Sequence, residues 1–132
     1  MHSYTHMASA DTVVWERFIR ANPTYFDAVA YDVQVGSGPG FDTVVNPDTG
    51  GNLDALYKKK IDVLGLKDGV HIIVEVKPRA DSRALGQVEG YRDLALRDLP
   101  GLKGPKLLIV CESIVPDFEY QAKIKGIEYA VV

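Results

Sequence analysis

Two acidic residues and a lysine are spaced so that a short β-hairpin would bring them together. The dipeptide Asp68-Gly69 separates two apolar runs, and this pair is typical of a two-residue hairpin turn. With that dipeptide as the loop, counting along the two strands predicts that Asp62 lies directly opposite Glu75. Lys77 follows Glu75 by two residues, so it points to the same face of the strand. The hairpin therefore predicts a cluster of two carboxylates and one amine.

Such a cluster would be costly without a ligand. Side chains directly opposite one another in a sheet have Cβ atoms about 4.5–5.5 Å apart, and like charges at that spacing repel. A divalent cation between the carboxylates would remove the repulsion. The sequence therefore predicts a metal-dependent hydrolase site on the hairpin.

Basic residues surround the predicted acids. Lys58 and Lys60 share the strand face of Asp62 by the period of two, and the predicted register sets Lys60 opposite Lys77. This basic face has two interpretations: a solvated edge of lysines, or a rim that contacts phosphates beside a metal.

The other elements follow from hydrophobic periodicity and from proline, glycine and capping residues. In chain order, the predicted elements are a helix at 10–21, a strand at 26–35, a long loop at 36–51, hairpin strands near 56–66 and 70–77, a helix from 81 or 82 to about 97, a strand at 106–111, a short helix ending at 126 and a strand at 127–132. Asp11 is the expected N-cap of the first helix, and Pro78 is expected to end the second hairpin strand.

This order predicts an α+β fold in one domain. The first three strands form an antiparallel meander, and the strand-helix-strand passages that follow add parallel strands, which gives a mixed sheet flanked by helices. We assign residues 10–132 to this domain and set residues 1–9 aside as a leader or disordered segment.

The composition narrows the functional classes. The net charge of −3 disfavours a protein that coats nucleic acid through bulk charge. The single cysteine, Cys111, excludes an internal disulfide and a thiolate zinc cluster, and it ends an apolar run that predicts burial. No apolar run approaches the roughly 20 residues needed to span a bilayer, so we expect no membrane partner and a cytoplasmic protein, of microbial or viral origin.

Three motifs in this order resemble the PD-(D/E)XK nuclease superfamily. They are Ile61-Asp62, Glu75-Val76-Lys77 and the Gln87-to-Tyr91 spacing, the last of which resembles the Gln-x-x-x-Tyr signature of RecB-like nucleases. The segment from Ile61 onwards is also similar to the catalytic domain of NucS-type mismatch endonucleases. The resemblance implies a restriction-endonuclease-like αβββαβ core with an extra C-terminal helix and strand.

The resemblance also implies roles for these residues. Asp62, Glu75 and the backbone carbonyl of Val76 would hold Mg²⁺ or Mn²⁺. Lys77 would either orient and help to deprotonate a water or neutralise charge on the phosphate, and Gln87 would reach the active site.

Further residues carry two interpretations each. Glu16 either faces the metal or pairs with Arg20 one turn along the helix. Tyr91 either contacts a phosphate or packs in the core. Arg79 and Arg83 either bind phosphates just past the site or lie free on the surface.

These features predict a Mg²⁺-dependent DNA endonuclease that acts on branched or structured DNA in repair or recombination. A homodimer would allow two symmetric cuts, and RNA is the less expected substrate. Two alternatives remain: a DNA-binding or assembly module of the same fold that no longer cuts, and a nuclease subunit that needs a helicase or recognition partner.

Overall fold

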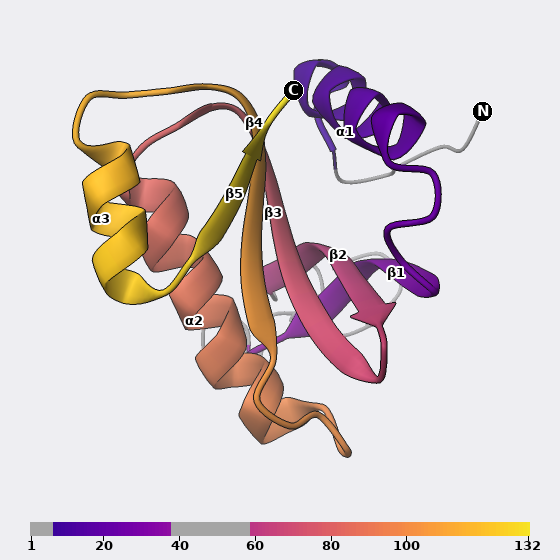
Figure 1. The fold of residues 1–132 in the computed structure, drawn as a ribbon. Helices are drawn as coiled ribbons and strands as arrows, with labels where there is room; N and C mark the ends of the chain where they lie inside the picture. The colour runs from indigo at the N-terminus through magenta and orange to yellow at the C-terminus, as the bar shows by residue number, and fades with distance from the viewer. Residues whose placement is uncertain (1–6, 38–58) are drawn as a thin grey trace, which may run out of the picture.

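The chain forms the predicted succession of helices and strands. A computed structural model describes residues 7–37 and 59–132, so the expected loop at 38–51, strand residues 56–58 and Lys58 lie outside the described residues. The elements are α1 (Ser9–Ala21), β1 (Ala28–Val35), β2 (Lys59–Lys67), β3 (Val70–Ala80), α2 (Ser82–Asp98), β4 (Lys106–Ile114), α3 (Phe118–Lys125) and β5 (Glu128–Val131) (Figure 1).

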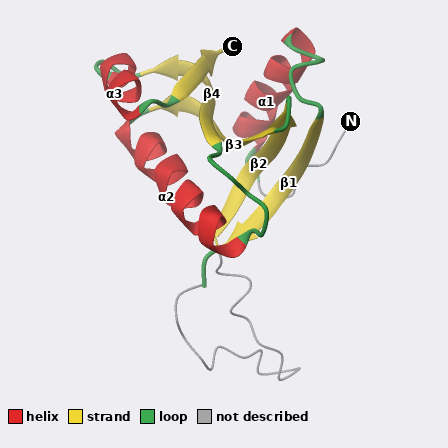
Figure 2. Cartoon of the chain, turned by 60° about the horizontal axis from the view of Figure 1, so that its bottom comes forward, coloured by secondary structure: helices red, strands yellow, loops and turns green. Residues whose placement is uncertain are grey.

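The strands form one mixed five-stranded sheet in the order β1-β2-β3-β4-β5. Strands β1 to β3 pair antiparallel, whereas β3–β4 and β4–β5 pair parallel through the crossover helices α2 and α3. Helix α1 covers one face of the sheet, and α2 with α3 lies on the other (Figures 1 and 2). The predicted meander and mixed sheet are confirmed.

Two apolar clusters fill the spaces between the sheet and these helices. On one face, Val14, Trp15 and Phe18 of α1 pack with sheet residues such as Val74 and Val110. This confirms the apolar stripe that the helix period predicts. The other cluster lies under α2 and α3, and it includes Leu85, Val88, Ile109, Cys111 and Phe118. The burial predicted for Cys111 is confirmed, and burial raises the pKa of its thiol to about 11.

The predicted hairpin forms with the predicted turn. Asp68 and Gly69 have φ angles of 51° and 79°, which is the left-handed backbone that a type I′ turn requires. Lys67 pairs with Val70, as the sequence predicts. The local preference of the Asp-Gly dipeptide therefore fixes the register of the whole β2–β3 ladder.

Several predicted boundaries are wrong. Strand β1 begins at Ala28 rather than at residue 26, and β4 continues to Ile114 rather than ending at residue 111. Helix α1 begins at Ser9 and its N-cap is Ala8, so Asp11 lies in the first turn and does not cap it. Met7, set aside with the leader, is buried in the α1 cluster. Strand β3 continues through Pro78 to Ala80, because beyond the β2 ladder it pairs only with β4, and a missing N–H is tolerated on the open side.

Strands β1 and β2 both change face near the middle. Tyr31 packs in the α1 cluster but Val33 packs in the α2 cluster, although alternate strand residues normally share a face. Val63 and Ile61 are divided between the two clusters in the same way. Asp32 lies at this point with φ of 56°, a left-handed conformation that aspartate adopts more easily than most residues. Asp62 lies at this change of face, between Ile61 and Val63.

Among the described residues, no helix is long and apolar enough to cross a membrane.

Candidate active site

Asp62 and Glu75 lie where the β2–β3 ladder opens. The ladder ends at the pair Val63–Val74, so the acids are not paired directly across it as predicted, and the expected pair of Lys60 with Lys77 does not form. The Asp62 side chain takes over the connection, because its Oδ2 accepts a hydrogen bond of 3.0 Å from the Val76 N–H. The departure from regular pairing thus turns Asp62 toward the third strand.

Glu75 is the only buried charged side chain among the described residues, with 3% of its surface exposed. Its Oε1 lies 3.6 Å from Nζ of Lys77, which is about one-third exposed. Its Oε2 is buried and accepts no hydrogen bond from a described donor, and the carboxyl groups of Glu75 and Asp62 lie close enough to share a hydrogen bond when one of them is protonated. A buried, unpartnered carboxylate oxygen costs free energy, so the fold holds Glu75 in a position that favours an additional cation.

The surroundings of the acids favour their protonated forms. Burial, followed by the charge of Asp62, raises the pKa of Glu75 to about 8, although Lys77 opposes the shift. Burial also raises the pKa of Asp62, while the hydrogen bond from Val76 lowers it. A site that desolvates two neighbouring carboxylates stores repulsion, which a proton or a metal ion can remove.

Asp11 is a further acid whose charge acts on the site, and the sequence did not reveal this. Its charge raises the pKa of both Asp62 and Glu75, and the charge of Lys77 lowers its own pKa against the larger effect of burial. The N-terminal turn of α1 therefore faces the acids of the sheet. The local sequence suggests only a cap at this position, because nothing nearby shows which strand the helix turn will meet.

Glu16, the acid expected to face the metal from this helix, is not among the groups that mainly shift the pKa of Asp62 or Glu75. It lies five residues beyond Asp11, which is about 140° around the helix and about 7.5 Å along it. Its role as a metal ligand stays a prediction.

Gln87 and Tyr91 meet one turn apart on α2. Nε2 of Gln87 donates a hydrogen bond of 3.2 Å to the Tyr91 hydroxyl. Tyr91 is 7% exposed and belongs to the apolar cluster, so its ring packs in the core. Burial and the charge of Glu75 raise its pKa to about 12, which keeps the phenol protonated. Gln87 is exposed and links this buried hydroxyl to the surface.

A polar hollow of about 590 Å³ adjoins the acid pair. The hollow is lined by Lys77, Arg79, Asp81, Arg83 and Gln87. Four of these residues were singled out from the sequence. The fifth, Asp81, is the N-cap of α2, because its Oδ1 accepts hydrogen bonds from the N–H groups of Arg83 and Ala84. The structure thus gathers the predicted lysine, glutamine and both arginines around one space.

The site fits a hard divalent cation. The unpartnered Oε2 of Glu75 and the neighbouring Asp62 are oxygen donors of the kind that Mg²⁺ and Mn²⁺ prefer. No group of three His, Cys, Asp or Glu side chains that could hold a metal occurs among residues 7–37 and 59–132. Mg²⁺ commonly takes one or two carboxylates and completes its shell with water and substrate phosphates, so two acids suffice.

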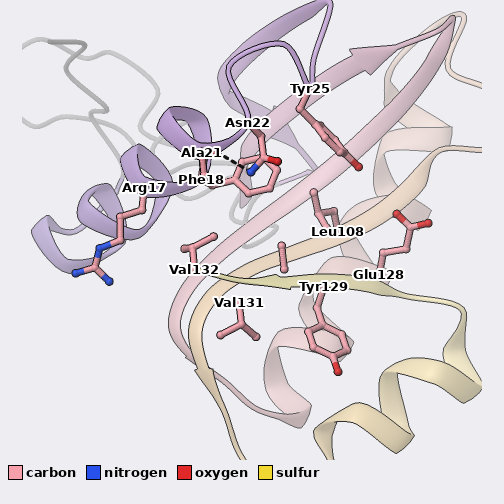
Figure 3. Close-up of a pocket in the computed structure, with 11 residues that line it drawn as sticks. Arg17, Phe18, Ala21, Asn22, Tyr25, Leu108, Glu128, Tyr129, Val131 and Val132 are labelled. Carbon is pink, nitrogen blue, oxygen red and sulfur yellow. Dashed lines mark hydrogen bonds between the residues drawn. The ribbon is translucent and has the colours of Figure 1, made fainter.

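A second hollow lies away from this site, between α1 and the edge of the sheet at β5 (Figure 3). It measures about 690 Å³. Apolar side chains such as Phe18, Leu108 and Val131 line much of it, while Arg17 and Glu128 contribute charges at exposed positions. Asn22 on its wall is held by a 3.0 Å hydrogen bond from its Nδ2 to the Phe18 carbonyl. None of the predicted site residues lines this hollow.

The mixed sheet flanked by helices has known structural counterparts. No protein-family model matches the chain, and no curated protein matches it. Solved structures do match its fold. A repair endonuclease from Pyrococcus abyssi has a TM-score of 0.57 and 20% sequence identity, over 100% of this chain and 49% of that one.

The nuclease EndoMS gives two further matches. In a complex with double-stranded DNA it has a TM-score of 0.54 and 19% identity, over 100% of this chain and 48% of that one. In its apo form it has a TM-score of 0.54 and 17% identity, over 97% and 48%. The chain therefore has the fold of these endonucleases and spans about half their length.

Proposed function

We propose that this chain is a metal-dependent DNA endonuclease of the PD-(D/E)XK type. The observation that carries the proposal is the buried Glu75, which lies next to Asp62 and Lys77 and whose Oε2 accepts no hydrogen bond from the described part of the chain. Burying such a group lowers the stability of the fold, and buried carboxylates with strongly raised pKa values are typical of active sites. The fold shared with repair endonucleases, one of them bound to double-stranded DNA, supports DNA as the substrate.

Each residue has a task that follows from its position. Asp62 and Glu75 present carboxylate oxygens for the cation, and the Val76 N–H fixes the orientation of Asp62. When bound, Mg²⁺ or Mn²⁺ would polarise the phosphate and lower the pKa of a water. Lys77, held beside Glu75 but partly exposed, is placed to contact the water or the phosphate oxygen at the mouth of the site.

The remaining polar groups shape the approach to this centre. Gln87 is oriented by the Tyr91 hydroxyl and reaches the hollow that Lys77 also lines. Asp11 adds a negative charge that favours a cation at the acid pair. A branched or otherwise structured DNA remains the expected substrate.

The test is cleavage of end-labelled DNAs that include a single strand, a duplex, a flap, a mismatch and a four-way junction. Each is incubated with Mg²⁺, Mn²⁺ or EDTA. We expect cutting that needs the metal and that disappears in Lys77→Ala, while Lys103→Ala, an exposed lysine in the turn after α2, cuts like the wild type.

A folded protein that binds DNA without cutting any member of the panel would contradict the nuclease. It would favour a DNA-binding or assembly module of the same fold. Cutting that persists in EDTA would contradict the metal site proposed here, and cutting that persists in Lys77→Ala would contradict the role proposed for Lys77.

A further inference from the structure

The polar hollow beside the acid pair has the charge of an anion site. Lys77, Arg79 and Arg83 bring three cations to its lining and Asp81 brings one carboxylate. That carboxylate is already engaged, because it accepts hydrogen bonds of 3.0 and 3.3 Å from the Arg83 and Ala84 N–H groups at the start of α2. Anion binding in this space therefore falls to the basic side chains.

The guanidinium groups of the hollow face the solvent. Arg79 is exposed, and the side chain of Arg83 is 93% exposed, with its Nε 3.9 Å from Asp81. A salt bridge at this exposure contributes little, so Arg83 loses little by turning to a ligand. Arginine presents paired N–H donors that match a phosphate, which makes these two residues suited to hold one.

The hollow also lies in line with the acid pair. Glu75, Lys77 and Arg79 occupy alternate positions of β3 at about 6.6 Å per step, and Lys77 and Arg79 both line the hollow. Lys77 forms an ion pair with Glu75 and also lines the hollow, so it connects the two. A nucleic acid strand whose phosphate sits at Glu75 and Lys77 would carry its next phosphate toward Arg79 and Arg83.

We infer that the hollow is a subsite for one phosphate of the cut strand, adjacent to the scissile phosphate and on one side of it only. The inference rests on the proposed nuclease function and deepens it. A strand that lacks a charged phosphate in this subsite loses the contact with Arg79 and Arg83. The last phosphodiester bond before a strand end on that side has no such neighbouring phosphate, so we expect it to be cut poorly. The subsite therefore favours internal cleavage over release of single nucleotides from that end.

The first test is a cleavage map on DNA that carries one neutral methylphosphonate at a defined position. In the wild-type protein, cutting is expected to vanish at the modified linkage and to fall several-fold at the linkage immediately on one side of it. In the double variant Arg79→Gln/Arg83→Gln, overall cutting is weaker and this one-sided gap is lost. The matched variant Lys103→Gln/Lys106→Gln removes the same charge at the opposite end of β4 and is expected to keep the gap.

The second test needs no cleavage. Binding of a fluorescent oligonucleotide to Asp62→Asn protein is measured by anisotropy across a series of salt concentrations. Adding the two arginine substitutions is expected to reduce the slope of log K against log salt by about 1, the loss of one phosphate contact. Adding the Lys103/Lys106 substitutions is expected to leave the slope unchanged.

The outcomes separate the two proposals. If the arginine substitutions reduce the slope of log K against log salt but the protein cuts no DNA, the proposed nuclease function is contradicted and the phosphate subsite is supported. A metal-dependent nuclease with no one-sided gap and an unchanged slope would keep the nuclease and overturn the subsite. A protein that binds no oligonucleotide overturns the subsite as well.

Discussion

The two hollows of this protein differ more in their chemistry than in their size. The one beside β5 measures about 690 Å³ and the one beside the acid pair about 590 Å³. The charged residues of the first, Arg17 and Glu128, lie at exposed positions where water solvates them. The second adjoins Glu75, which is 3% exposed and has a carboxylate oxygen that accepts no hydrogen bond from residues 7–37 or 59–132.

This difference shows that a large hollow is a poor guide to the reactive part of a small domain. Solvated charges on the wall of a hollow cost the fold little, whereas a buried carboxylate beside another acid opposes folding. The costly arrangement is the one that needs a functional explanation. The predictions below compare matched changes in the two hollows, or within the acid cluster itself.

The largest expected effect separates two glutamates. Glu75→Gln removes a proposed metal ligand with almost no change in shape, so we expect cleavage to fall by at least about 10²–10³-fold, similar to the loss of one essential stabilising group in other active sites. Glu128→Gln makes the same chemical change in the other hollow and is expected to leave the rate within about twofold. Both variants are compared by their initial cleavage rates on the best DNA substrate. Equal decreases in rate would contradict the proposal that only the hollow beside the acid pair is part of the active site.

The second prediction concerns stability in the absence of metal. The pKa of Glu75 is raised from 4.5 to about 8, so between these pH values the folded state binds more protons than the unfolded state. The free energy of unfolding should therefore fall as pH rises from about 5 to 8, by an amount on the order of a few kcal/mol at most. Urea unfolding at several pH values measures it.

The matched variants sharpen this prediction. Glu75→Gln should flatten the decrease, and Glu128→Gln should retain it. Added Mn²⁺ should restore stability at pH 8 in the wild type, since a cation replaces the proton at the acid pair. A metal-free wild type whose stability is the same at pH 5 and pH 8 would contradict the raised pKa.

A smaller effect distinguishes the two acids of α1. Asp11→Asn should raise the Mg²⁺ concentration needed for half-maximal cleavage by about three- to tenfold, the loss of one nearby charge at roughly 1 kcal/mol, with little change in the rate at saturating Mg²⁺. Glu16→Gln removes the same charge from the same helix and should change this concentration less. A larger effect of Glu16→Gln than of Asp11→Asn would instead support the sequence-based prediction that Glu16 faces the metal.

The smallest predicted effect concerns Tyr91. Tyr91→Phe removes the hydroxyl that orients Gln87 but keeps the packed ring, so unfolding free energy should change by no more than about 1 kcal/mol. Cleavage should fall only a few-fold, and Gln87→Ala should fall by a similar factor because both changes break the same contact. A double variant no weaker than either single variant would show that the two residues act together.

Local preferences explain the parts that could be predicted from the sequence. The Asp68-Gly69 turn set the hairpin register, Asp81 capped α2, and the helical period placed Trp15 and Phe18 in the core. Each of these depends on interactions within a few residues of chain. The resemblance to the nuclease superfamily rested on Ile61-Asp62, Glu75-Val76-Lys77 and the Gln87-to-Tyr91 spacing, and the structures that match this chain share its fold.

Only the tertiary structure decided how the site is finished. The sequence by itself determined the order of the elements and the face that Glu75 and Lys77 share, because turn chemistry and strand alternation are local. The β2–β3 ladder opens at Asp62 because of how the strands bend. The charge of Asp11 acts on the acids because α1 packs across the sheet. These contacts join residues distant in the chain, so no local pattern could reveal them.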